Sequence, residues 1–369
     1  MIKSPTGPSL TVYTYVDSRG RNVKGHEYDI PLRPGTVRTT IGRQITMTEI
    51  ASSDTKPLGK LAYFPVGFFS SIMGLYGTAL AFHAAGFAGP SIWIAGFATL
   101  VFACILTLYA AKAVLHPSEV AADWNHPVKI AFFPAISISL LLGATALRGA
   151  MPDIAAGVWI AGAALQAMLT LAVIASWIGH RGFGAGHLSP AWFIPAVGNV
   201  VAPIAGVPLG YIEVSWYFFS VGLLFWVILL TIVINRLVFH EPMAAKLRPT
   251  LVILIAPPAV GFLAWTQLNG GVVDPMARVL MHLGLFFTAL VVTQIPALLR
   301  LPFALSFWAL SFPFAAMTVA CFRYAELTTS GAVFAPLAWV LLGVLSVIVV
   351  ALLARTTLAV LRSEICLPE

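Results

Sequence analysis

Charged residues are scarce in this chain. Asp, Glu, Lys and Arg make up only 9% of its 369 residues, whereas about 25% is usual in a soluble globular domain. Hydrophobic residues make up 59%, and the mean hydropathy is +0.91. This composition excludes an ordinary soluble domain and predicts a protein that crosses a membrane several times.

Ionisable residues are also missing from the middle of the long apolar runs. Those near the run ends are Asp153, Glu213, Asp274, Arg323 and Glu326 on one side and Glu119, Asp123, Arg236 and Glu241 on the other. Charge at membrane depth is costly and usually functional. We therefore expect neither an intramembrane enzyme nor a deep carboxylate that could bind a coupling proton or sodium ion.

Metal and nucleotide motifs are absent as well. The sequence has no His-Glu-x-x-His, paired-cysteine or phosphate-cradling motif, so an ATP-driven pump is disfavoured and no metal or cofactor is expected. His83 and His282 are expected to be hydrogen-bonded packing residues. The three cysteines, Cys104, Cys321 and Cys366, indicate no disulfide framework.

Apolar runs of about 20 residues, long enough to cross a bilayer as helices, recur between residues 61 and 361. Ten are recognisable, at 62–86, 91–115, 127–148, 153–178, 190–207, 213–238, 249–268, 276–298, 303–325 and 333–360. The sequence thus predicts an all-α polytopic membrane protein with ten transmembrane helices in residues 61–361. A polar, basic tail (1–60) precedes this domain and a short tail (362–369) follows it.

The basic residues predict the orientation. Of the 21 Lys and Arg residues, nine lie in the 1–60 tail, nine lie on the same face of the membrane domain, and three (Arg148, Arg278 and Arg323) lie on the opposite face. The positive-inside bias then puts both termini in the cytoplasm, with the protein in a bacterial inner membrane. The tail has no signal-peptide core, so the first helix is expected to direct insertion.

The basic tail allows two structural interpretations. The formal charge of +7 indicates topology and not nucleic-acid binding, because no folded basic surface is recognisable. Residues 10–28 alternate as a strand would, which predicts either a small cytoplasmic hairpin or, with more support, a disordered tail at the membrane surface.

Prolines divide the ten runs into two alternating sets. Five runs carry a proline in their first half, namely Pro65, Pro134, Pro195, Pro257 and Pro313. The runs between them do not, once prolines at helix ends such as Pro90, Pro152, Pro275, Pro296 and Pro336 are excluded, because a first or last turn tolerates them. Proline removes a backbone hydrogen bond, which is tolerated where a helix faces protein or water rather than lipid. The pattern predicts five tandem hairpins, a weak repeat of about 60 residues, with the proline-bearing helices enclosing a central pore.

Small residues lie on one face of these proline-bearing helices. The stripes are Gly67, Ser70, Ser71, Gly74, Gly77 and Thr78; Pro195, Gly198, Asn199, Ala202 and Gly206; and Ala309, Pro313, Ala316 and Ala320. Close helix packing is one interpretation, and a lumen is the other. Recurrence on alternate helices favours a lumen, which could pass an anion attracted by rim arginines and helix dipoles.

Four motifs resemble the tellurite-resistance/dicarboxylate transporter family, which includes TehA and the plant slow anion channels. They are Phe64-Pro65-Val66-Gly67-Phe68-Phe69, Asn125-His126-Pro127-Val128, the stretch from His187 to Val197, and Phe307-Trp308-Ala309-Leu310-Ser311-Phe312-Pro313. The resemblance covers residues 61–361 and not the tail. One departure is Ser70, where many relatives have glycine.

The resemblance implies five hairpins around a pseudo-five-fold axis, one pore in each protomer, and a homotrimer. It also implies that Phe312 occludes the pore. The function it implies is passive movement of small inorganic or organic anions by an anion channel or channel-like exporter. The alternative is a proton-coupled carrier of C4-dicarboxylate, tellurite or sulfite. A non-transporting sensor is a third hypothesis.

Overall fold

The computed structural model describes residues 15–16, 22–23, 59–179 and 183–366, in two compact units formed by residues 1–56 and 57–369. In the first unit, strand β1 (Tyr15–Val16) pairs antiparallel with β2 (Asn22–Val23), with Tyr15 opposite Val23. This pairing fits the hairpin interpretation of the tail. The rest of the strand-like alternation lies outside the described residues.

The second unit is helical throughout its described residues. Its α-helices are α1 (Phe69–Ala84), α2 (Ala88–Leu115), α3 (Pro117–Asn125), α4 (Ala135–Leu147), α5 (Pro152–Ile178), α6 (Phe193–Gly206), α7 (Ile212–Phe239), α8 (Ala256–Leu268), α9 (Pro275–Leu298), α10 (Ser311–Leu327) and α11 (Gly331–Leu361). Six 3-10 segments join them: η1 (Val66–Phe68), η2 (Lys129–Phe132), η3 (Ala185–His187), η4 (Pro190–Trp192), η5 (Ala245–Ile255) and η6 (Leu305–Leu310).

The fold class predicted from the sequence is confirmed: this is an all-helical, polytopic membrane protein. Among the described residues, nine helical stretches are long and apolar enough to cross a membrane. The fifth predicted run is present as the shorter apolar stretch Pro190–Gly206. The exact number of full spans therefore stays a prediction, as does the pseudo-five-fold symmetry.

Burial separates the helices into the two predicted sets. In the four long spans that carry or directly follow Pro65, Pro134, Pro257 or Pro313, 61–78% of the most apolar window is buried, whereas in the five spans of the other set only 22–33% is buried. Almost every residue of α6 is buried as well. We call α1, α4, α6, α8 and α10 the inner helices. The outer helices α2, α5, α7, α9 and α11 expose large apolar side chains such as Trp93 and Leu171, as contact with lipid requires.

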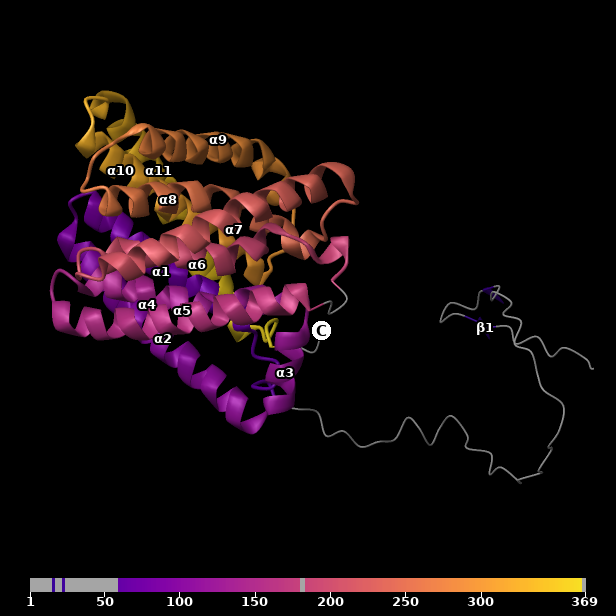
Figure 1. Ribbon diagram of the computed structural model, residues 1–369. Coiled ribbons are helices and arrows are strands. Elements are labelled where there is room, and N and C mark those ends of the chain that lie inside the picture. Colours follow the sequence, from indigo (N-terminus) through magenta and orange to yellow (C-terminus); the bar gives the residue numbers. More distant parts are fainter. Residues whose placement is uncertain (1–14, 17–21, 24–58, 180–182, 367–369) are drawn as a thin grey trace, which may run out of the picture. The chain divides into compact units, whose positions relative to one another are not determined.

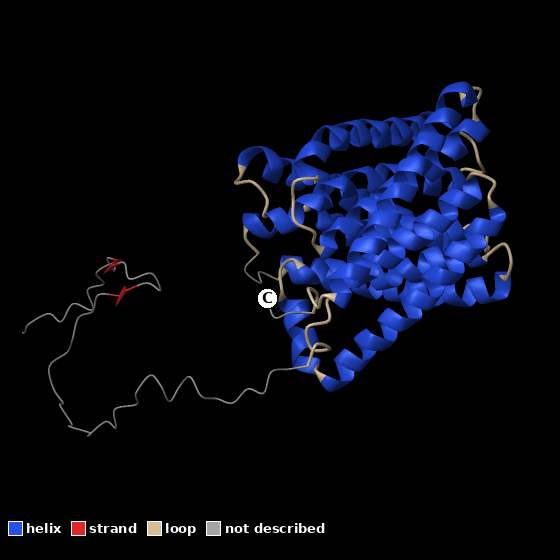
Figure 2. Ribbon diagram, turned by 180° about the vertical axis from the view of Figure 1, so that it is seen from behind, coloured by secondary structure: helices blue, strands red, loops and turns tan. Residues whose placement is uncertain are grey.

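The inner helices form a closed ring. Each packs against the next in the series α1, α4, α6, α8, α10, and α10 packs against α1; each also packs against the outer helix that follows it. Figure 1 shows α2 and α9 along opposite edges of the helical unit, and Figure 2 shows its loops gathered at the two helix ends. All inner helices begin at one end, here called the start face, and finish at the other, the end face.

The five prolines mark the change from 3-10 to α-helical backbone. Pro134 caps α4, while Pro195, Pro257 and Pro313 lie in the first turns of α6, α8 and α10. Pro65 precedes η1, which leads into α1. A missing N–H is tolerated in a first turn because that group has no partner inside the helix. Every one of these prolines except Pro65 therefore lies at the junction of two helix types, and Pro65 lies directly before the 3-10 segment η1.

Glycines close the ring between α1 and α10. A Cβ atom placed on Gly74 would lie 1.9 Å from Ser311 Oγ and 2.6 Å from Ser311 Cβ, and one on Gly77 would lie 2.8 Å from Ala315 Cβ. Only hydrogen at these positions permits the observed approach of the two helices. At Gly74 and Gly77 the small-residue stripe thus serves helix packing.

We predict that Gly74→Ala destabilises the protein by about 1–3 kcal/mol, because the new methyl group overpacks the α1–α10 contact. Thermal unfolding of the purified protein measures the loss. Ser311→Gly in the same chain should restore much of it by removing the clashing atoms. The control is Gly96→Ala in α2, where nothing lies within 4 Å of the added Cβ; equal losses at Gly74 and Gly96 would contradict the ring-closure role.

Candidate functional site

A polar network positions the inner helix α6. Ser137 Oγ of α4 donates to Gln166 Oε1 of α5 (2.6 Å), and Gln166 Nε2 donates to the carbonyl of Pro195 (3.0 Å). The same carbonyl accepts a bond from Asn199 Nδ2 (2.8 Å), whose side chain also donates to Thr170. The predicted site residues Pro195 and Asn199 therefore act together where α6 meets α5.

Within the ring, a first cavity of about 380 Å³ lies at the start face. Pro65, Gly67, Lys129, Lys246 and Leu305 are among the residues that line it, and they come from η1, η2, η5 and η6. A neighbouring cavity of about 390 Å³ shares Pro65 and both lysines. Lys129 and Lys246 thus lie beside the position where the inner helices begin, and the second cavity is also lined by Glu119, Asp123 and Glu364.

The next cavity is very small, about 20 Å³, which is room for roughly one water molecule. Its lining includes Ser70, Ala309, Phe312 and Pro313, all predicted site residues. The Ser70 side-chain oxygen is buried and has no hydrogen-bond partner in the structure. In this structure the cavity is too small for a hydrated anion.

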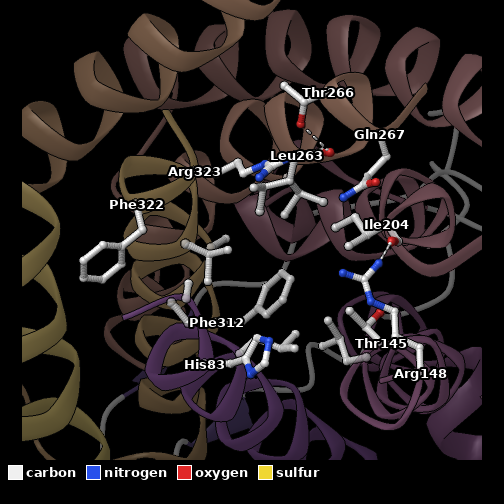
Figure 3. Close-up of a pocket in the computed structure, with 18 of the residues that line it drawn as sticks. His83, Thr145, Arg148, Ile204, Leu263, Thr266, Gln267, Phe312, Phe322 and Arg323 are labelled. Carbon is white, nitrogen blue, oxygen red and sulfur yellow. Dashed lines mark hydrogen bonds between the residues drawn. The ribbon is translucent and has the colours of Figure 1, made fainter. Parts of the chain in front are cut away.

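The third cavity has a volume of about 480 Å³, larger than the other two, and lies toward the end face. All five inner helices contribute to its wall, which includes Phe312 and the predicted residue Ala316 of α10. Figure 3 shows Arg148, Arg323, Gln267 and His83 among the residues that line it. His83, expected as a packing residue, therefore faces a cavity.

Two arginines give this end-face cavity a positive character. Arg148, at the end of α4, donates from Nη1 to the Ile204 carbonyl (2.8 Å), whereas Arg323 of α10 pairs with Glu326 Oε2 (2.7 Å). No ion pair joins Arg148 to any carboxylate among the described residues.

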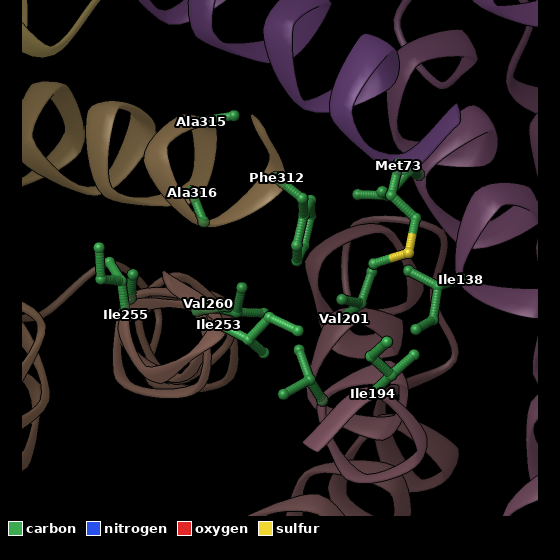
Figure 4. Packing of buried hydrophobic residues seen from close by; sticks show 14 of the residues in the cluster. Met73, Ile138, Ile194, Val201, Ile253, Ile255, Val260, Phe312, Ala315 and Ala316 are labelled. Carbon is green, nitrogen blue, oxygen red and sulfur yellow. The ribbon is translucent and has the colours of Figure 1, made fainter. Parts of the chain in front are cut away.

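Phe312 lies between the smallest and the largest cavity and lines both. Its side chain is only 7% exposed. Figure 4 shows the ring directed toward apolar side chains of other inner helices, among them Met73, Val201 and Val260. Phe314, two residues further along α10, is also buried but lines neither cavity.

The predicted site residues fall into two groups. Pro65, Gly67, Ser70, Ala309, Phe312, Pro313 and Ala316 line the three cavities. Pro134, Pro195, Pro257, Gly74 and Asn199 are not among the lining residues and contact neighbouring helices or cap a helix instead. Their part in anion passage stays a prediction.

Sequence reasoning missed which arginines face the cavity. It placed Arg148, Arg278 and Arg323 together on one face, but Arg278 of α9 donates instead to the hydroxyl of Tyr324 (3.2 Å) and does not line the cavity. The sequence did contain one signal for this difference. Arg148 and Arg323 lie at the ends of inner helices, whereas Arg278 lies on an outer helix.

Sequence reasoning also missed a buried ion pair at the start face. Lys112 of α2, only 2% exposed, lies 2.5 Å from Asp123 Oδ2 of α3 and donates to the Phe64 carbonyl (3.0 Å). Lys129 lies 3.2 Å from the other oxygen of Asp123. Lys112 thus connects α2 to α3 through Asp123 and to the segment that precedes α1 through the Phe64 carbonyl.

We predict that Asp123→Ala destabilises the protein by about 3–5 kcal/mol, because it leaves the Lys112 ammonium buried without its partner. Adding Lys112→Met should recover most of that stability, since the pair is then replaced by apolar contacts. Thermal unfolding in detergent provides the measurement. The control is Glu364→Ala in the exposed Arg362–Glu364 pair (3.9 Å), where a loss under about 1 kcal/mol is expected. A loss as large as that of Asp123→Ala would contradict this account.

Residues 63–357 match the model of the SLAC1 family, described as voltage-dependent anion channel. The match covers most of the chain, including every inner helix and the cavities between them. The chain therefore belongs to the SLAC1 family, and the resemblance drawn from the four sequence motifs is confirmed.

Curated relatives of this chain include proteins from a plant and a bacterium. The chain is 26% identical over 295 residues to the S-type anion channel SLAH3 of Arabidopsis thaliana, with 76% of this chain and 46% of the relative covered. It is 28% identical over 262 residues to the tellurite resistance protein TehA homolog of Haemophilus influenzae, covering 69% and 79% respectively. The guard cell S-type anion channel SLAC1 of Arabidopsis thaliana is 23% identical over 283 residues, covering 72% of this chain and 50% of the relative. The chain spans about half the length of the plant relatives.

Proposed function

We propose that this protein moves small anions passively across the bacterial inner membrane through the ring of inner helices, as an anion channel or channel-like exporter. The observation that carries the proposal is the row of cavities inside the ring, with lysines at the start face, arginines at the end face and Phe312 at the narrowest part. The relatives named as anion channels support it.

Charge distribution supports anions as the transported species. Lys129 and Lys246 line the start-face cavity, and Arg148 and Arg323 line the end-face cavity. The smallest cavity between them is lined by no charged residue. Positive potential at both ends of the passage attracts anions. Because the constriction is uncharged, it does not hold an anion tightly, and the anion can leave the passage.

Phe312 has the position of a gate in this proposal. Its ring lies between the two cavities in a region with room for little more than one water molecule. A ring in a narrow apolar passage excludes hydrated ions by volume and by dewetting. Opening would then require the ring to rotate or the inner helices to move apart.

The proposed assembly is a homotrimer with one passage in each protomer and with both termini and the start face in the cytoplasm. The family resemblance supports the trimer. The excess of basic residues at the start face supports the orientation.

A proton-coupled carrier of dicarboxylate, tellurite or sulfite is the second candidate. It is favoured by His83 and Glu326, two groups able to bind protons, which line the end-face cavity together with the arginines. The name of the Haemophilus influenzae relative refers to tellurite resistance. Flux measurements distinguish this carrier from a channel.

We expect the purified protein in liposomes to show anion-selective flux that follows membrane potential and not an imposed proton gradient. The reason is that the constriction has no carboxylate to couple a proton. Reversal potentials under opposed chloride and potassium gradients measure the selectivity. Cation-selective potentials would overturn the proposal, and saturating flux driven by the proton gradient would establish the carrier.

We predict that Phe312→Ala raises anion conductance at least tenfold by removing the ring from the constriction, while the amount and oligomer size of the protein stay near wild type. Single-channel or liposome flux recordings measure the gain. Phe314→Ala is the matched control, being the same residue type in the same helix and equally buried but away from the cavities. Equal gains from both variants, or folded Phe312→Ala protein without any gain, would show that the ring is only a packing element.

A further inference from the structure

Arg148 is the least compensated cation among the groups that line the end-face cavity. It is partly buried, and within the described residues it donates a hydrogen bond to the Ile204 carbonyl and forms no ion pair. Arg323, by contrast, has Glu326 as its counter-charge. A desolvated cation without a counter-ion is unfavourable, so this cavity favours the binding of an anion beside Arg148.

The donors of Arg148 determine which kind of anion fits best. Its Nη1 already donates to a carbonyl, and the guanidinium has five N–H donors in a rigid planar fork. The remaining donors can hold two oxygens of one anion in parallel, a geometry that a single halide ion cannot use. The site therefore discriminates between oxyanions and halides.

Two neighbours complete the site. Arg323, on α10, lines the same cavity. Gln267 adds a side-chain amide on the Arg148 side of the cavity (Figure 3). The hydroxyls of Thr145 and Thr266 already donate to helix carbonyls, so the further donors to a ligand are the remaining N–H groups of the two arginines, the Gln267 amide and the His83 ring.

We propose that the end-face cavity holds a dedicated oxyanion-binding subsite, with Arg148 as the bidentate ligand and Arg323 and Gln267 as supporting donors. An anion that presents two oxygens to one guanidinium, as sulfate, nitrate and carboxylates do, rests there before or after it passes Phe312. The inference rests on the proposed function, since it takes this cavity as one mouth of the passage.

Binding to the purified full chain in detergent tests the subsite. The probes are sodium sulfate, sodium nitrate and sodium chloride, and the apparent affinity of each comes from the concentration dependence of the unfolding temperature. Wild type should bind sulfate or nitrate about tenfold more tightly than chloride, as one bidentate charged contact provides. Arg148→Lys keeps the positive charge but lacks the planar guanidinium. It should remove the preference for oxyanions and leave the apparent affinity for chloride within about twofold of the wild-type value.

Arg278→Lys is the matched control, because Arg278 lies near the same end face but outside the cavity. It should leave all three affinities unchanged. A wild-type protein without any oxyanion preference would overturn the inference, and so would an equal loss from Arg278→Lys.

A second measurement needs no variant. Phenylglyoxal modifies guanidinium groups, and mass spectrometry reports the extent at each arginine. Sulfate, but not chloride at equal ionic strength, should protect Arg148 and leave Arg278 as reactive as before. Equal reactivity of Arg148 in both salts would overturn the inference even if Arg148→Lys did not fold.

These tests are separate from those of the proposed function. Binding and protection are equilibrium properties and do not depend on flux. Liposomes that pass anions while Arg148→Lys keeps the oxyanion preference would refute the subsite alone. Oxyanion binding at Arg148 in a protein that passes no anion would refute the transport proposal and retain the subsite.

Discussion

The approach of α1 to α10 is the constraint on which the remaining architecture depends. Four of the five inner-helix contacts join helices of neighbouring hairpins, but this one joins the first hairpin to the last and closes the ring. It is possible only because Gly74 and Gly77 have no side chain to meet Ser311 and Ala315. Without that closure Phe312, which also sits on α10, would not face the other inner helices across a confined space.

Polar groups inside the bundle are arranged in two different ways. At the start face, the charge of Lys112 is matched by Asp123, and in the middle Gln166 and Asn199 satisfy the Pro195 carbonyl. These contacts join inner segments to outer ones and stabilise the fold. Arg148, at the end face, has no such counter-charge among the described residues. The buried charge of Lys112 is thus paired, whereas the charge of Arg148, which has no counter-charge among the described residues, lies on the cavity wall.

Much of the fold could be predicted from the sequence because helices that cross a lipid bilayer must be apolar over their whole length in the membrane. Apolar length predicted the helices, and the alternation of prolines such as Pro134 and Pro257 predicted which set is buried. The sequence could not separate packing from lumen on one stripe: Gly67 and Ser70 line cavities, whereas Gly74 contacts Ser311. That distinction depends on helix rotation and crossing, which a single helix does not encode. For the same reason the inward position of Arg148 was missed.

The two ends of the helical unit meet at the start face, where Lys60 Nζ donates to Ser363 Oγ at 2.8 Å. Every hairpin begins and finishes at that face, and the hairpins contact each other around a closed circle. Joining these ends and opening the chain in another start-face loop, such as residues 240–244, would keep all of the ring contacts. The ring therefore does not depend on which hairpin comes first along the chain. We expect the same fold from a circularly permuted chain.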